Sequence, residues 1–78
     1  MGQYFYFRDD TGMISKKSLR WNFGLSWIKS FERMDESEQI KIFKEVMELN
    51  GWKKGKISAV GDYGDIIIYD SESQTIDP

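Results

Sequence analysis

The segment from Asp35 to Trp52, DESEQIKIFKEVMELNGW, carries the two ends and the buried face of a helix. Asp35 is placed to cap the first turn by accepting hydrogen bonds from backbone amides, and Glu38 stands where a capping box requires it. Gly51 can adopt the left-handed conformation that ends a helix, after which Trp52 packs back on the last turns. At about 100° per residue, the apolar positions cover roughly half of the circumference. They are Ile40, Ile42, Phe43, Val46, Met47 and Leu49. A face this wide predicts two neighbours, a second helix and a sheet.

Runs of strand-forming residues on both sides of this helix predict two β-hairpins. Residues 3–8, QYFYFR, form a strand that is followed by the turn DDTG and a return strand over residues 13–16. Residues 57–60 and 66–69 form a second hairpin around the glycine-rich turn GDYGD. The sheet is therefore expected to be antiparallel and four-stranded.

The segment before Asp35 is expected to form a second helix. Trp27, Phe31 and Met34 fall on one helical stripe, which predicts a helix from about Phe23 to Arg33 that packs antiparallel to the first one. The expected fold class is α+β, a two-layer ββααββ arrangement with the helical hairpin on one face of the sheet. Residues 1–70 form the single domain, and the polar tail 71–78, SESQTIDP, is expected to be disordered.

The composition excludes several kinds of chemistry. The chain has 78 residues, enough for one small domain, and contains neither histidine nor cysteine. The commonest general base, the thiol nucleophile and the usual zinc ligands are therefore missing. The paired carboxylates, Asp9 with Asp10 and Asp62 with Asp65, lie in expected turns, where a domain this small offers no deep pocket to shift a pKa. We expect no enzymatic activity, no cofactor, no metal site and no small-molecule substrate.

The sequence also bears on location. No apolar run approaches the roughly 20 residues of a membrane span, and the first residues lack the pattern of a secretion signal. Together with the absence of cysteine, this favours a soluble protein of the cytoplasm with no membrane partner.

One face of the expected sheet is left uncovered, because the helical hairpin covers only the other. Side chains alternate along a strand, so the two phenylalanines of QYFYFR are assigned to the core and Tyr4 and Tyr6 to the uncovered face, together with Ile67 and Tyr69. An uncovered face with tyrosines is typical of protein contact or self-association. We therefore expect a small non-catalytic protein-binding module that uses these residues: an adaptor, a subunit or a stoichiometric inhibitor of the kind that viruses and mobile elements encode.

An alternative hypothesis rests on charge. If a helical hairpin returns the backbone to where it left the sheet, two basic segments meet at one pole of the domain. This basic pole consists of Lys16, Lys17, Arg20, Trp21, Trp52, Lys53, Lys54 and Lys56. By the same tracing, the opposite pole is acidic and includes Asp9, Asp10, Asp35, Glu36, Glu38, Asp62 and Asp65. Cations beside stacking aromatic rings are typical of single-stranded nucleic-acid binding, although a net charge of −2 and a pI near 5.0 lack the usual basic footprint.

Overall fold

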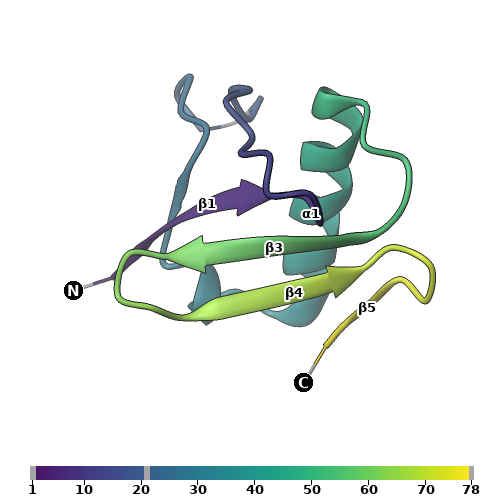
Figure 1. Ribbon diagram of the computed structural model, residues 1–78. Coiled ribbons are helices and arrows are strands. Elements are labelled where there is room, and N and C mark those ends of the chain that lie inside the picture. The colour runs from purple at the N-terminus through teal and green to yellow at the C-terminus, as the bar shows by residue number, and fades with distance from the viewer. Residues whose placement is uncertain (1, 21, 78) are drawn as a thin grey trace.

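The computed structural model describes residues 2–20 and 22–77, and these form a small α+β fold with one α-helix against a curled antiparallel sheet. In chain order the elements are β1 (Tyr4–Arg8), β2 (Ile28–Lys29), the 3-10 helix η1 (Phe31–Arg33), α1 (Glu36–Asn50), β3 (Lys56–Gly61), β4 (Ile66–Asp70) and β5 (Thr75–Ile76). The described strands form a five-stranded sheet in the order β2-β1-β3-β4-β5, with every neighbouring pair antiparallel. Helix α1 lies behind β1 and β3 in Figure 1, so the opposite side of the sheet faces the viewer.

Helix α1 has the boundaries that its sequence predicts. The Asp35 carboxylate accepts a hydrogen bond from the Glu38 amide at 2.9 Å and another from the Ser37 hydroxyl at 2.8 Å. These two bonds hold the pKa of the Asp35 carboxyl below its ordinary value. At the other end Gly51 has a φ of 70°, and the Trp52 amide donates to the Met47 carbonyl at 2.9 Å. The Asp35 cap and the glycine ending are therefore confirmed.

The core between α1 and the sheet is built mainly from aromatic rings. Phe43 of α1 contacts Phe7 and Phe31 edge to face, with ring centroids 5.5 and 5.3 Å apart, and stacks on Tyr69 at 5.3 Å. All four residues are at most 1% exposed. Large rings bury much area per residue, which suits a chain too short to build a large core.

The expected helix from Phe23 to Arg33, and with it the helical hairpin and the ββααββ order, is wrong. Residues 22–24 form a turn in which Phe23 and Gly24 have φ values of 53° and 79°. The Asn22 side chain donates to the Trp27 carbonyl at 2.5 Å, a local bond that competes with helix formation. Next, β2 pairs with Tyr4 and Phe5 of β1 and buries Ile28. Short as β2 is, it covers an edge of β1 that would otherwise stay open.

The expected return strand over residues 13–16 is reduced to a single bridge. The turn before it is present: the Gly12 amide donates to the Asp9 carbonyl at 3.1 Å, and the Asp9 carboxylate accepts from the amides of Thr11 and Met13. Beyond the turn, Ile14 bridges Arg8 and the chain then leaves the sheet. The Ser15 amide still donates to the Phe7 carbonyl at 2.8 Å, and the Ser15 hydroxyl accepts from the Asn50 side chain at the end of α1 at 2.8 Å.

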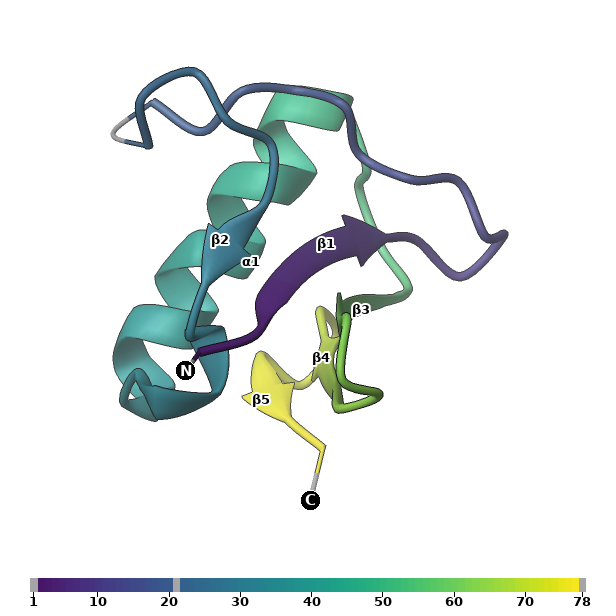
Figure 2. The same cartoon turned by 90° about the vertical axis from the view of Figure 1, so that its left-hand side faces the viewer.

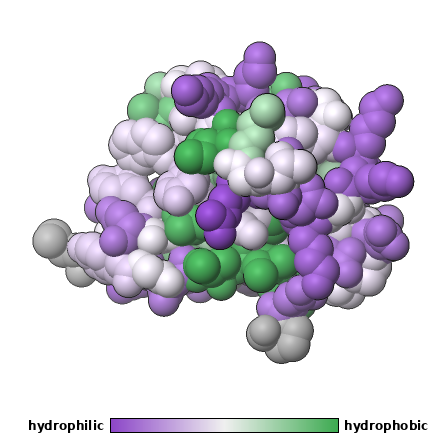
Figure 3. Space-filling view, viewed as in Figure 1, coloured by the Kyte–Doolittle hydropathy of each residue, from purple (hydrophilic) through white to green (hydrophobic). Residues whose placement is uncertain are grey.

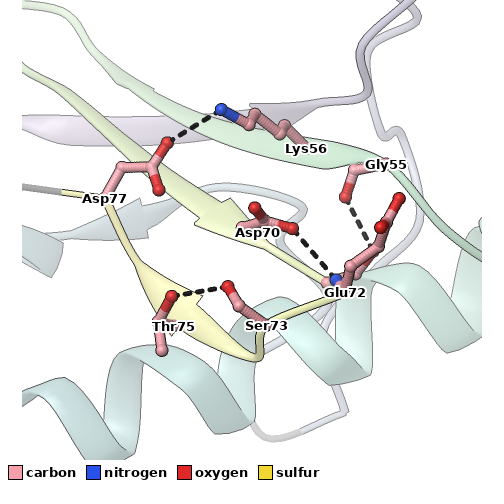
Figure 4. Close-up of polar contacts among 8 residues, drawn as sticks. Gly55, Lys56, Asp70, Glu72, Ser73, Thr75 and Asp77 are labelled. Carbon is pink, nitrogen blue, oxygen red and sulfur yellow. Dashed lines mark hydrogen bonds and ion pairs between the residues drawn. The ribbon is translucent and has the colours of Figure 1, made fainter.

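Within the tail that the sequence predicts to be disordered, residues 71–74 form a turn and residues 75–76 form the edge strand β5. Figure 4 shows the polar contacts of this segment. The Glu72 amide donates to the Asp70 carboxylate at 3.0 Å, and Lys56 forms an ion pair with Asp77 at 3.2 Å. Ile76 packs against the core. The ion pair and the packing of Ile76 join residues far apart in the sequence, so the polar composition of residues 71–78 did not show them.

Both edge strands curl toward the helix. Figure 2 shows the sheet from its end, with β2 alongside α1 on one side. Strand β5 contacts α1 from the other edge. The sheet therefore wraps its concave side around α1, and no described element covers its convex side. We call this convex side the open face.

Candidate functional site

The pairing register of the strands decides which side chains share the open face. Residues directly opposite each other in antiparallel strands point to the same side. Tyr6, Val60 and Ile66 lie opposite one another across β1, β3 and β4, and they form an apolar row across this face. The next row contains Ile14, Arg8, Ser58 and Ile68. The last row is polar and contains Lys56, Asp70 and Thr75.

Tyr4 and Trp27 extend the open face beyond the apolar row. Trp27 stands immediately before β2, and its ring meets Tyr4 edge to face, with centroids 4.7 Å apart and planes at 83°. The two residues remain 41% and 39% exposed, and Ile66 is 53% exposed. Figure 3 shows hydrophobic side chains over the middle of this face and hydrophilic ones along its right-hand side. The open face is thus apolar at one end and polar where β3 begins.

Two residues that the sequence analysis assigned to this face lie on the other side of the sheet. Ile67 is opposite Ala59 on β3 and packs against the core. Tyr69 is only 1% exposed, and its burial, followed by the charge of Asp70, raises the pKa of its hydroxyl. Ile66 and Ile68 occupy the open face instead. Tyr4 and Tyr6 lie on the open face as predicted.

The basic segments approach each other through polar contacts at the C-terminal end of α1. The Asn50 side chain donates to the Ser15 hydroxyl at 2.8 Å, which holds the segment carrying Lys16 and Lys17 at the helix end that Lys53 and Lys54 follow. Trp21 lies outside the described residues.

Acidic groups are interspersed with these cations. The Arg20 guanidinium pairs with Glu48 at 2.7 Å, and Lys56 pairs with Asp77. Trp52 is partly buried against the core. We call the region where Lys16 and Lys17 approach Lys53 and Lys54 the basic end. A Cβ atom added to Gly55 would lie 2.7 Å from the Asp10 carboxylate, so the turn of residues 9–12 lies at the basic end. The expectation that Asp9 and Asp10 belong to an opposite acidic pole is therefore wrong, because β1 ends where β3 begins.

A buried glutamine that the sequence analysis did not single out fixes the turn between β3 and β4. Gln3 is 5% exposed, and its amide group donates to Asp65 at 2.5 Å and to Glu32 at 3.4 Å. Its carbonyl accepts from the Tyr63 amide at 3.3 Å. Gln3 thus ties the start of β1 to a turn about sixty positions later, which no local pattern could reveal.

Phe23 is the most exposed of the large hydrophobic residues in the described chain. It is 96% exposed and sits in a left-handed conformation, which is strained for a bulky side chain. The neighbouring Ser18 hydroxyl donates to the Gly24 carbonyl at 2.9 Å and braces this loop. The grouping of Asn22, Gly24 and Ser26 was the available sequence signal for a loop.

Comparison with other proteins leaves the site to be interpreted from its own chemistry. No protein-family model, no curated protein and no solved structure matches the chain. Within residues 2–20 and 22–77, no helix has the length and apolar character needed to cross a bilayer. The same residues contain no group of three or more acidic, histidine or cysteine side chains arranged to hold a metal ion.

Proposed function

We propose that the protein is a non-catalytic protein-binding module whose partner docks on the open face of the sheet. The observation that carries this proposal is the apolar row of Tyr6, Val60 and Ile66, extended by Tyr4 and Trp27, on a side of the sheet that no described element covers. A contiguous apolar patch with a polar margin is a common mark of an interaction site.

The arrangement of polarity on the open face resembles that of a protein interface. Protein interfaces have an apolar, aromatic centre, a polar rim and an enrichment in tyrosine, tryptophan and arginine. Here the polar row of Lys56, Asp70 and Thr75 borders the apolar residues on one side. Arg8 stands between the two, and the described structure gives it no ion-pair partner. A carboxylate of the partner would complete its interactions.

A photo-crosslinking experiment tests this proposal. A benzophenone amino acid is placed at Ile66 on the open face and, as a matched control, at the exposed Lys41 on α1. After irradiation of the cells that naturally contain the protein, we expect an adduct with another protein from position 66 and none from position 41. Sedimentation of the purified protein shows whether the partner is a second copy of this chain.

A second substitution makes the experiment specific for the surface. Tyr6→Ser should reduce the adduct at position 66 at least about tenfold, because it removes an aromatic contact from the centre of the patch. Tyr63→Ser removes an equally large side chain from the β3–β4 turn, where it is 65% exposed, and should leave the adduct unchanged. Equal adducts from positions 66 and 41, or no effect of Tyr6→Ser, would refute the proposal.

The alternative proposal, single-stranded nucleic-acid binding at the basic end, has less support. Arg20 and Lys56 are already engaged with carboxylates, and Glu48 lies beside Trp52 and Lys53 in a shallow hollow of about 290 Å³. Carboxylates at these positions repel phosphates. Titration of a labelled single-stranded oligonucleotide decides the matter. Affinity that falls steeply with salt and is lost in the double variant Lys53→Glu, Lys54→Glu would favour this alternative.

A further inference from the structure

The open face contains a hollow with walls of aromatic rings. Tyr4, Tyr6 and Trp27 line it together with Asp62 and with Phe5, whose own ring is buried in the core on the other side of the sheet; the volume of the hollow is about 270 Å³. Tyr4 and Tyr6 come from the same side of β1, and Trp27 reaches the hollow from the residue before β2. We call this site the aromatic hollow. The face of an aromatic ring carries negative electrostatic potential, so a site lined by several rings attracts cations more than neutral groups.

Asp62 adds a full negative charge to the aromatic hollow and is held in position by β1. Its amide donates to the Tyr4 carbonyl at 3.0 Å, and its Oδ1 accepts from the Tyr4 amide at 3.1 Å. The carboxylate is therefore anchored at the start of β1 by the backbone. Asp62 is exposed, and within residues 2–20 and 22–77 its Oδ2 has no hydrogen bond or ion pair, so this oxygen can meet a cation at the margin of the otherwise apolar hollow.

The protein's own lysine shows how a cation meets one of these rings. Lys29 lies directly opposite Tyr4 across the β1–β2 pair, and its Nζ is 6.0 Å from the centre of the Tyr4 ring. This distance is at the outer limit of a cation–π interaction. Lys29 has a second effect, because its charge repels any other cation that enters. Removal of Lys29 should therefore strengthen the binding of a cation in the aromatic hollow.

We propose that the aromatic hollow receives a cationic side chain, lysine or arginine, which the partner protein presents to the open face. The apolar walls contact the alkyl part of such a side chain, the rings of Tyr4 and Tyr6 face its charge, and Asp62 Oδ2 pairs with the charged end. A neutral aliphatic side chain gains only the first of these contacts. This inference rests on the proposed function, because it names what the partner inserts.

Titration with single amino-acid derivatives tests the inference without the partner. The capped amides of lysine, arginine and norleucine are added at low salt to the isotopically labelled protein, and the amide signals of Tyr4, Tyr6 and Asp62 are followed by NMR. Norleucine is the neutral counterpart of lysine. We expect weak saturable binding of the two cations in the millimolar range and about tenfold weaker binding of norleucine.

Two variants and a control separate the contributions of the charges. Asp62→Asn keeps an oxygen that accepts the Tyr4 amide hydrogen bond but removes the charge, and it should weaken lysine binding about fivefold to tenfold. Lys29→Met should tighten lysine binding about threefold to fivefold, because a repulsive charge is lost. Asp65→Asn removes the same charge from the same turn outside the aromatic hollow and should have less than a twofold effect.

The outcomes distinguish this inference from the proposed function. Equal binding of lysine and norleucine, or equal effects of Asp62→Asn and Asp65→Asn, would overturn the cation site even if a partner crosslinks at position 66. Selective lysine binding together with a failed crosslink would leave the cation site standing and refute docking on the open face. Binding of the cations outside the aromatic hollow, shown by shifts elsewhere in the spectrum, also overturns the inference.

Discussion

The consecutive isoleucines of β4 offer the sharpest test of the register that defines the open face. Ile66 and Ile67 are neighbours with the same side chain, yet Ile66 is 53% exposed on the open face and Ile67 packs against the core. Changing each to alanine removes the same atoms and the same strand propensity. Any difference in the loss of stability therefore reports the environment of the side chain.

The expected losses follow from burial. Replacing a buried isoleucine with alanine costs about 2–5 kcal/mol, and the partial burial of Ile67 places Ile67→Ala at roughly 2–3 kcal/mol. Ile66 keeps half of its surface in water, so Ile66→Ala should cost about 1 kcal/mol or less. Total stability for a chain of this size is roughly 4–12 kcal/mol, so both variants should fold.

Urea denaturation followed by tryptophan fluorescence measures these losses. With a slope of about 1 kcal/mol/M, the transition midpoint should fall by about 2–3 M for Ile67→Ala and by less than about 1 M for Ile66→Ala. An equal or larger loss for Ile66→Ala would mean that β4 is shifted by one residue. Such a shift moves every side chain of the strand to the other face, and both proposals about the open face would then fail.

Three further predictions concern the core and the titrating groups. Phe43→Leu should lower the free energy of unfolding by about 2 kcal/mol, because the three aromatic rings around Phe43 lose their contact with its ring. Phe23→Leu at the 96% exposed position is the matched control, and a similar loss of stability in both variants would contradict the aromatic core. Tyr69→Phe should reduce the fall in stability above about pH 10. Burial raises the pKa of the Tyr69 hydroxyl, so this hydroxyl ionises at a lower pH in the unfolded chain than in the folded one. Urea titrations between pH 8 and 11 that show the same alkaline loss of stability in the variant would exclude this cause. Asp35→Asn should retain the helix cap at pH 7 but lose less stability than the wild type below about pH 4. The lowered pKa of the Asp35 carboxyl contributes stability to the wild type, and this contribution disappears as the carboxylate is protonated. Acid denaturation that is the same in both proteins would show that Asp35 is not responsible.

The parts of the fold that the sequence predicted are those with local causes. The ends of α1 depend on Asp35 and Gly51, whose capping bonds reach only a few residues. Strand β1 and the β3–β4 hairpin follow from short runs of strand-forming residues around glycine-containing turns. Each of these elements was predicted to within about two residues, because its boundaries are set by neighbours in the chain.

The parts that the sequence did not predict depend on distant partners. The stripe of Trp27, Phe31 and Met34 fitted a helix, yet the chain there bends at Phe23 and pairs Ile28 with Phe5 of β1. Periodicity cannot show that an edge of β1 lies open at that point. The same reason applies to residues 71–77, whose contacts are with Gly55, β3, β4 and α1.

The assignment of Ile67 to the open face was wrong for a different reason. Residues 66–68 are all isoleucine, so the strand has no alternation of apolar and polar positions from which to read its two faces. Only the pairing of Ile67 with Ala59, and of Ala59 with Phe7, assigns Ile67 to the core. In β1 the alternation of tyrosine and phenylalanine shows from the sequence which side chains face the core, and Tyr4 and Tyr6 were placed correctly.

The composition of the open face is not explained by folding alone. Helix α1, with 15 residues, covers one side of the sheet, and the exposed side of an antiparallel sheet is usually polar. Cross-strand contacts among Tyr6, Val60 and Ile66 stabilise the sheet by roughly 0.2–1 kcal/mol for each pair, a gain that threonine or charged pairs would largely match. Aromatic and aliphatic side chains at these positions therefore add little to stability beyond what polar residues supply. Their distinctive property is the apolar surface that they offer to another molecule, and this is why the open face, rather than the basic end with its paired carboxylates, is the stronger candidate for function.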